Sequence, residues 1–146
     1  MRIDVHRGED VPPIASLADV ADREGLAFVR RTIDEWESGA NRFDEWGACL
    51  ALGIDGSTVV GMCGVNRDPY LDDPTVARLR HLYVVPRSRR SGVGSALVRW
   101  SVDRSRPYFD RIRLRTFDAG ANAFYRTIGF VATAEGDATH ELVLRD

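Results

Sequence analysis

The chain changes between two spacings of apolar residues, one typical of strands and the other typical of helices. Arg2–Arg7 alternates apolar with polar positions, which predicts a first strand. Between Pro12 and Arg42 the apolar residues recur every three or four positions, which predicts a helical region. Asp22–Gly25 divides this region into two helices, and Ser38–Asn41 ends the second.

The rest of the chain predicts further strands and two more helices. Asp55-Gly56 is a hairpin signal, and Arg106-Pro107 ends a helix. We expect strands at 48–54, 58–65, 77–85, 111–117, 130–135 and 140–144, and helices at 94–104 and 122–127. The predicted order is β-αα-β-β-β-α-β-α-β-β, an α/β (α+β) arrangement. No repeat or long linker interrupts it, so we expect a single domain over residues 1–146.

Composition narrows the class of protein. The 146 residues are 44% hydrophobic and 29% charged, a globular mixture. The net charge of -2 does not favour nucleic acid or an anionic membrane as the main partner. No apolar run approaches the ~18 residues of a membrane span, and the first residues lack the apolar core of a signal peptide. We therefore expect a cytoplasmic protein in which Cys49 and Cys63 are buried thiols.

A six-residue segment, Arg89-Arg90-Ser91-Gly92-Val93-Gly94, lies between a predicted strand and a predicted helix. Such a turn directs backbone N–H groups and the positive end of the helix at one point, which suits phosphate. Gly92 and Gly94 have no Cβ, so an anion can approach the backbone closely. Arg89 and Arg90 add permanent positive charge.

Three phosphate-binding loops can be compared with this segment. A P-loop needs a lysine, and the chain contains none. A dinucleotide-binding turn needs Gly or Ala where Leu97 stands, and it belongs in the first βα unit. The third pattern, R-x-x-G-x-G, fits Arg89, Gly92 and Gly94, and it resembles the coenzyme-A loop of the GCN5-related N-acetyltransferase (GNAT) family. The alternative is an ordinary strand-to-helix turn with incidental arginines.

A second segment, residues 122–130, resembles the short helix of the same family. It carries Asn122, then Phe124-Tyr125, then Gly129-Phe130. Structural roles would also explain these residues: Asn122 as a helix cap, the two phenylalanines as core, and Gly129 as a C-terminal turn. Tyr125 has two interpretations, a packed ring with a hydrated hydroxyl or a proton donor.

The resemblance extends over essentially the whole chain and implies a GNAT fold, a mixed, mostly antiparallel central sheet flanked by helices. It implies acetyl-CoA as co-substrate and no metal. The backbone of Leu82, Tyr83 and Val84 would bind the pantetheine arm and polarise the thioester, and Asn122 would contact the pantetheine region. Tyr125 would be the general acid. The pyrophosphate would be bound by Arg89, Arg90, Ser91, Gly92, Val93, Gly94 and Ser95.

The general base is where the sequence departs from the family. Many members carry a carboxylate on the strand before the coenzyme-A loop, whereas this chain has arginines there, with His81 next to them. Arginine cannot act as a base at neutral pH. Three alternatives remain: His81 as the base, an amine that arrives already deprotonated, or a water chain to Asp72, Asp73 or His140. His81 has an equal structural interpretation, and a bulge, usual in this strand of the family, would change the face on which it lies.

Four arginines on predicted neighbouring strands have two interpretations. They would form a pocket for a carboxylate-bearing or phosphorylated amine, or they would lie at solvated strand edges paired with Asp and Glu. These residues are Arg78, Arg80, Arg113 and Arg115.

The sequence therefore predicts an acyl-CoA-dependent N-acyltransferase, which transfers acetyl from acetyl-CoA to a primary amine of a small molecule or peptide by direct attack. The alternative is a non-catalytic GNAT-like module that binds or senses acyl-CoA, and the missing carboxylate is its support. An acyltransferase acting on charged transfer RNA is disfavoured by the pI of about 5.9. The acceptor is not identified, and the oligomeric state is open, although GNAT domains often form homodimers.

Overall fold

The computed structural model describes residues 1–145, which form one seven-stranded sheet and four α-helices. The strands are β1 (Arg2–His6), β2 (Cys49–Asp55), β3 (Thr58–Arg67), β4 (Val76–Val84), β5 (Arg111–Leu114), β6 (Val131–Ala132) and β7 (His140–Val143). The helices are α1 (Ala15–Arg23), α2 (Phe28–Ser38), α3 (Val93–Ser105) and α4 (Ala119–Ile128), with a 3₁₀ turn, η1 (Pro86–Ser88). The predicted order of elements is confirmed.

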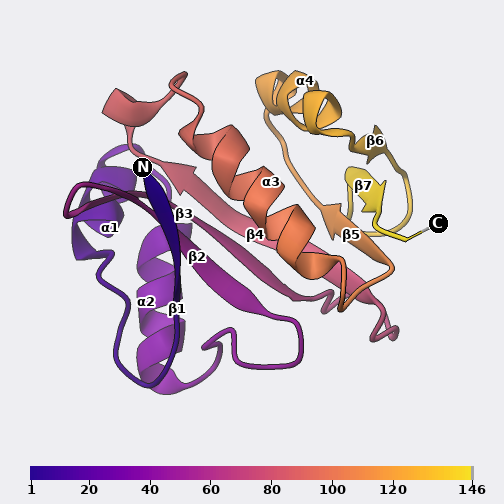
Figure 1. Cartoon of the computed structure of the whole chain (residues 1–146), viewed down its shortest axis with the longest axis horizontal. Coiled ribbons are helices and arrows are strands. Elements are labelled where there is room, and N and C mark those ends of the chain that lie inside the picture. The colour runs from indigo at the N-terminus through magenta and orange to yellow at the C-terminus, as the bar shows by residue number, and fades with distance from the viewer. Residues whose placement is uncertain (146) are drawn as a thin grey trace.

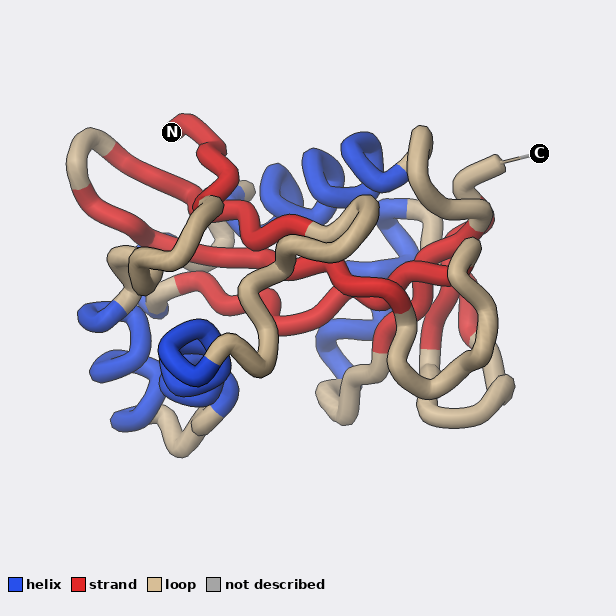
Figure 2. Tube along the Cα trace, turned by 90° about the horizontal axis from the view of Figure 1, so that it is seen from below, coloured by secondary structure: helices blue, strands red, loops and turns tan. Residues whose placement is uncertain are grey.

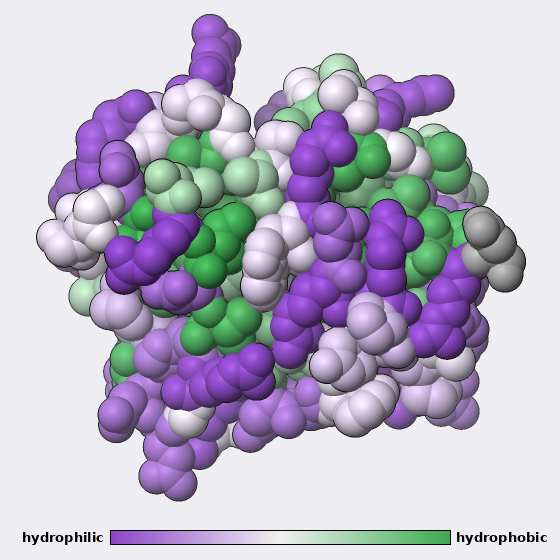
Figure 3. Space-filling view, viewed as in Figure 1, coloured by the Kyte–Doolittle hydropathy of each residue, from purple (hydrophilic) through white to green (hydrophobic). Residues whose placement is uncertain are grey.

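The sheet is the middle layer of the molecule, in the order β1-β2-β3-β4-β5-β7-β6. Helices α1 and α2 lie together against one face and α3 crosses the other, as Figures 1 and 2 show. Helix α2 buries Val29, Ile33 and Trp36, whose spacing of three and four places them on one side of the helix. On the α3 face, hydrophobic side chains appear as separate patches among hydrophilic ones (Figure 3). Within residues 1–145, none of the helices combines the length and apolarity needed to span a membrane.

Strands β4 and β5 form the only parallel pair among the described strands, and they separate early. They pair from Val76↔Arg111 to Arg78↔Arg113, after which no further pairing joins them. The prediction of a strand through residue 117 was therefore wrong, because β5 ends at Leu114. The edge of β4 from Leu79 to Val84 consequently has no β5 partner for its backbone groups.

A β-bulge interrupts the opposite edge of β4. Met62 pairs with Tyr83 and Gly64 pairs with Arg80, so Cys63 faces two residues, His81 and Leu82. The backbone of His81 is left-handed, with φ 62°. The bulge that the family resemblance implies is thus present.

Two glycines in β3 allow close approach from both sides of the sheet. A Cβ on Gly64 would lie 2.6 Å from a ring carbon of Phe43, and a Cβ on Gly61 would lie 3.0 Å from Leu97 of α3. Both glycines therefore act through packing, and each also lies beside a bulge: Gly64 faces the bulge of β4, and Gly61 follows Val60, the extra residue of β3 in its pairing with β2.

Two of the four strand arginines are structural. Arg78 and Arg113 are buried side by side, and the same oxygen of Asp68 lies 3.3 Å from Arg78 Nη1 and 3.7 Å from Arg113 Nη1. Arg78 donates to the carbonyl of Asp137 at 2.6 Å, and Arg113 donates to the carbonyls of Glu135 and Gly136. These bonds hold the β6–β7 loop against the sheet. Pairing with an acid is confirmed for Arg78 and Arg113, but the expectation of solvated strand edges was wrong for them, because both are buried. Arg115 pairs with Asp137 at an exposed position.

We expect Asp68→Asn to lower the free energy of unfolding by about 3–5 kcal/mol, because it leaves two buried guanidinium groups without their counter-charge. Urea unfolding followed by circular dichroism measures the loss. The matched control is Asp72→Asn, since Asp72 is fully exposed and pairs with Arg67 on the surface of the same loop. The control should keep wild-type stability, and an equal loss in both variants would contradict a special role for Asp68.

Candidate active site

The predicted phosphate loop leads directly into α3. Arg90 and Gly92 both have left-handed backbones, with φ 63° and 87°. Gly92 is the N-cap of α3 and provides no side-chain bond to the first turn. A Cβ on Gly92 would meet nothing within 4 Å, so the space beside the loop is open. The first N–H groups of α3 therefore face an open, positively charged surface that fits an anionic group such as pyrophosphate.

Gly94 joins this loop to two other elements. A Cβ there would lie 3.6 Å from Val84 of β4 and 3.7 Å from the ring of Phe124 in α4. The end of β4, the start of α3 and the middle of α4 thus meet at one place. The free edge of β4 that contains Leu82, Tyr83 and Val84 leads to this meeting point.

Arg89 is held by a residue that the sequence did not indicate. Its Nη1 and Nη2 atoms donate to the two carboxylate oxygens of Glu24 at 2.9 and 2.6 Å, and its Nε donates to the carbonyl of Val84. The hydroxyl of Tyr83 donates to the same carboxylate at 2.5 Å. The bonds from Arg89 and then Tyr83 lower the pKa of Glu24, while burial and the bond to Glu24 raise the pKa of Tyr83 to about 12. This Glu24 clamp ties the end of α1 to the loop.

Asn122 has a different role from the predicted helix cap. Helix α4 begins at Ala119, and the side chain of Asp118 caps it by accepting from the N–H of Gly120 at 2.9 Å. Asn122 lies inside the helix, and its side-chain oxygen is 2.8 Å from Nε2 of His140. The cap prediction was therefore wrong, since the helix starts earlier than the apolar pattern indicated.

Tyr125 is buried on the inner side of α4. Its ring lies 5.0 Å from Phe124, 5.6 Å from Phe130 and 6.0 Å from His140. Burial raises the pKa of Tyr125, and Cys63 at the β4 bulge adds to the shift. Tyr125 therefore remains protonated at neutral pH and lies near the level of the bulge. Within residues 1–145 its hydroxyl forms no hydrogen bond, so its proton is available to a ligand.

His81 is enclosed by aromatic rings and arginines. It stacks on Phe28 at 5.9 Å and meets Phe43 edge-on at 6.3 Å. Its Nε2 atom accepts from Nε of Arg80 at 3.0 Å, which places the proton of the neutral ring on Nδ1. Burial, followed by the charges of Arg80 and Arg31, lowers the pKa of His81 to about 3. This environment makes the imidazole a weak base.

Of the other residues considered for a water chain, the two aspartates lie far from the bulge of β4 and the histidine lies near Tyr125. Asp72 and Asp73 precede β4, at the opposite end of that strand from the bulge. Asp73 bonds locally to Thr75, and Asp72 pairs with Arg67. His140 lies near Tyr125 but is engaged on both ring nitrogens, by Thr139 and Asn122. Neither of the two carboxylates therefore lies beside the bulge, and the imidazole of His140 is already bonded on both sides.

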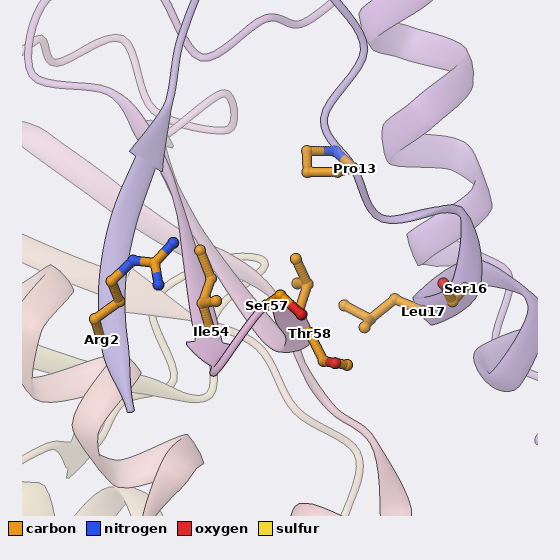
Figure 4. Close-up of a pocket in the computed structure, with 8 residues that line it drawn as sticks. Arg2, Pro13, Ser16, Leu17, Ile54, Ser57 and Thr58 are labelled. Atoms are coloured by element: carbon orange, nitrogen blue, oxygen red, sulfur yellow. The ribbon is translucent and has the colours of Figure 1, made fainter.

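A cavity of about 420 Å³ lies away from the residues described so far. It is bounded by β1, the start of α1 and the β2–β3 hairpin, and Figure 4 shows Arg2, Leu17 and Ile54 around it. The guanidinium of Arg2 is bonded to Asp4 and to the carbonyl of Gly56. None of the predicted site residues lines this cavity.

Comparison with known proteins establishes the family. The sequence model of the acetyltransferase (GNAT) family matches residues 16–130, which include the loop before α3 and the whole segment 122–130 around Tyr125. The chain therefore belongs to the GNAT acetyltransferase family. None of the curated proteins matches the sequence.

Solved structures show the same fold. A candidate acetyltransferase from Exiguobacterium sp. 255-15 superposes with a TM-score of 0.83 at 24% identity, covering 98% of this chain and 94% of the other. A GNAT-family acetyltransferase from Staphylococcus aureus Mu50 gives 0.71 at 20% identity, covering 99% and 100%. The ribosomal-protein-S18-alanine N-acetyltransferase of Escherichia coli gives 0.72 at 15% identity, covering 99% and 94%. At identities of 15–24%, these three structures show that the fold is shared.

The environment of His81 predicts a specific dependence of stability on pH. Because its pKa is about 3 in the folded protein and about 6.5 when unfolded, the unfolded chain binds more protons between these values. Stability is complete above pH 6.5 and decreases as the pH falls. From pH 7 to 5 we expect His81 to contribute a loss of about 2 kcal/mol. The lowered pKa values of Glu24 and Glu135 act below pH 4.5, outside this window.

Chemical unfolding at pH 7, 6 and 5 measures this loss. His81→Asn is the matched variant, because asparagine tolerates the left-handed backbone better than most residues. The variant should lose markedly less stability over the same range than the wild type. Parallel losses in the two proteins would show that His81 is not the group that titrates.

Proposed function

We propose that this protein transfers an acetyl group from acetyl-CoA to a primary amine of a small molecule or peptide by direct attack. The observation that carries the proposal is the free edge of β4 from Leu79 to Val84, which leads to the open loop at the start of α3. Family membership supports the acetyltransferase class. Tyr125 supports catalysis, since a buried phenol with a raised pKa lies near the same edge.

The residues present fit the co-substrate. The N–H groups from Gly92 to Ser95 and the charge of Arg90 suit the pyrophosphate. The edge of β4 at Leu82 and Val84 has no β5 partner and suits an extended arm with amide groups, although the carbonyl of Val84 already accepts from Arg89. Arg89 would orient this site from its bonds with Glu24 and Val84. When bound, acetyl-CoA supplies an activated thioester.

The site contains a good proton donor but only a weak proton acceptor. Tyr125 holds a proton that it can donate to a leaving thiolate, because its raised pKa keeps the phenol neutral. His81, with a pKa of about 3 and Nε2 bonded to Arg80, is a weak acceptor. We therefore propose that the amine loses its proton to solvent before attack, and that positioning beside the thioester provides most of the acceleration.

A binding module that senses acyl-CoA without turnover is the second candidate. The weak basicity of His81 favours it, together with the distance of Asp72 and Asp73 from the bulge. The two candidates share the co-substrate site and differ in turnover. Release of free thiol in the presence of an amine decides between them.

Binding of acetyl-CoA is tested by calorimetric titration of the wild type and of Arg90→Glu. Arg90 is exposed and forms no ion pair within the described residues, so the variant should fold normally. We expect at least a ten-fold weaker Kd, since repulsion replaces attraction at the pyrophosphate. Arg7→Glu makes the same charge change after β1, far from the loop, and should bind like the wild type. If the wild type does not bind acetyl-CoA, the proposed function fails.

Catalysis is tested by Tyr125→Phe, which keeps the buried ring and removes its hydroxyl. We expect kcat to fall by about 10²-fold, the lower range for a positioned acid, with little change in the Kd of acetyl-CoA. The rate of thiol release over a library of amines is the measurement. A variant as fast as the wild type would remove Tyr125 from the mechanism. If no amine releases thiol from a wild type that binds acetyl-CoA, the binding-module alternative gains support.

A further inference from the structure

Two adjacent arginines on α2 have opposite surroundings. Arg30 donates to Asp19 at 2.6 Å and to Asp22 at 2.9 Å, so its charge is balanced by α1. Arg31 is exposed and forms no ion pair with the described residues. Phe28, one helical turn before Arg31, stacks on His81. Residues three apart are neighbours on a helix surface, so Arg31 lies on the side of α2 that faces the bulge of β4.

Arg80 brings a second unbalanced charge to the same place. Its Nε atom bonds to His81, and within residues 1–145 no carboxylate pairs with its guanidinium. The side chain is half-buried, and its terminal nitrogens are not among the buried polar atoms that lack a partner. They therefore remain accessible to solvent or to a ligand.

Several carboxylates around β4 and its loops pair with other arginines and not with Arg31 or Arg80. This distinguishes Arg31 and Arg80 from the arginines that have structural roles on this side of the sheet. The engaged pairs are Glu24 with Arg89, Asp68 with Arg78 and Arg113, Glu135 with Arg111, and Asp137 with Arg115. Arg31 and Arg80 therefore stand outside these pairs, and Asp34 and Glu35, the acidic residues that follow Arg31 on α2, form no ion pair with it within residues 1–145.

We propose that Arg80 and Arg31 bind an anionic group of the acceptor, so that the acceptor is an amine carrying a carboxylate or phosphate a few bonds from its nitrogen. The inference rests on the proposed function, because it places this group next to the β4 edge where the thioester would lie. Both arginines lie near His81, because Arg80 bonds to its ring and Arg31 is one helical turn from Phe28, which stacks on that ring. Phe28, Phe43 and His81 supply an apolar wall beside the charges.

The chemistry of the two guanidinium groups explains the choice of ligand. A guanidinium is permanently charged and presents paired N–H donors that match carboxylate and phosphate oxygens. An acceptor with an uncharged or cationic group at this position would leave the two charges without compensation. The two guanidinium groups would thus attract an anionic group of the acceptor and repel a cationic one, and both effects favour anionic amines.

The experiment measures binding of reaction products to the protein saturated with coenzyme A. The probes are N-acetyl derivatives of common amino acids, each compared with its C-terminal amide and with the matching aminoalkyl phosphonate derivative. We expect the anionic members to bind at least ten-fold more tightly than the amides, in the range of a charge-assisted hydrogen bond. Comparison of carboxylate with phosphonate identifies the source of the anion.

The variants Arg80→Gln and Arg31→Gln should remove this preference and leave the Kd of acetyl-CoA unchanged. Arg30→Gln is the matched control, since it removes the neighbouring charge that α1 already balances, and it should keep the preference. Equal binding of acids and amides, absence of binding by either, or an unchanged preference in both variants would overturn the proposal. Loss of acetyl-CoA binding by the wild type would instead refute the proposed function, and the probes would then be titrated into the protein alone.

Discussion

The early separation of β4 and β5 is the constraint on which the candidate site depends. Parallel strands normally satisfy their backbone groups along their whole length, but here the pairing ends after Arg78↔Arg113. The remaining edge of β4 is an unpaired strand edge inside a sheet, where α4 and the start of α3 approach it. A backbone edge kept free in this way can bind an extended ligand, which gives the fold a site before any side chain is considered.

Arginine–carboxylate contacts fix both ends of β4. At the start of the strand, Asp68 joins Arg78 to Arg113, and the two arginines hold the β6–β7 loop. At the far end, Glu24 joins Arg89 to α1 through the clamp that also includes Tyr83. Both supports use arginine with a carboxylate, in a chain that contains no lysine. Because guanidinium groups form several directed bonds at once, they can fix loops as well as balance charge.

Features that depend on short segments could be predicted from the sequence, whereas features that depend on contacts between distant residues could not. The loop from Arg89 to Gly94 and the segment around Tyr125 carry local patterns, and the order of elements follows from apolar spacing. Glu24 could not be found in this way, since it meets Arg89 across 65 positions and lies between two predicted helices. The end of β5 was also missed, because alternation continues past Leu114 although the neighbouring strand has moved away. Arginine was too frequent for any single one to indicate a role before its partners were known.

The two buried cysteines have a practical consequence for assays of this protein. Burial raises the pKa of Cys49, and burial raises the pKa of Cys63 to about 12. The thiolate is the reactive form, so both sulfurs are nearly inert in the folded protein at neutral pH. Reagents that report a newly formed thiol will therefore respond to coenzyme A well before the protein itself. If the reagent reacts increasingly with the protein's own cysteines, the protein is unfolding, so the same reagent also reports whether the protein remains folded.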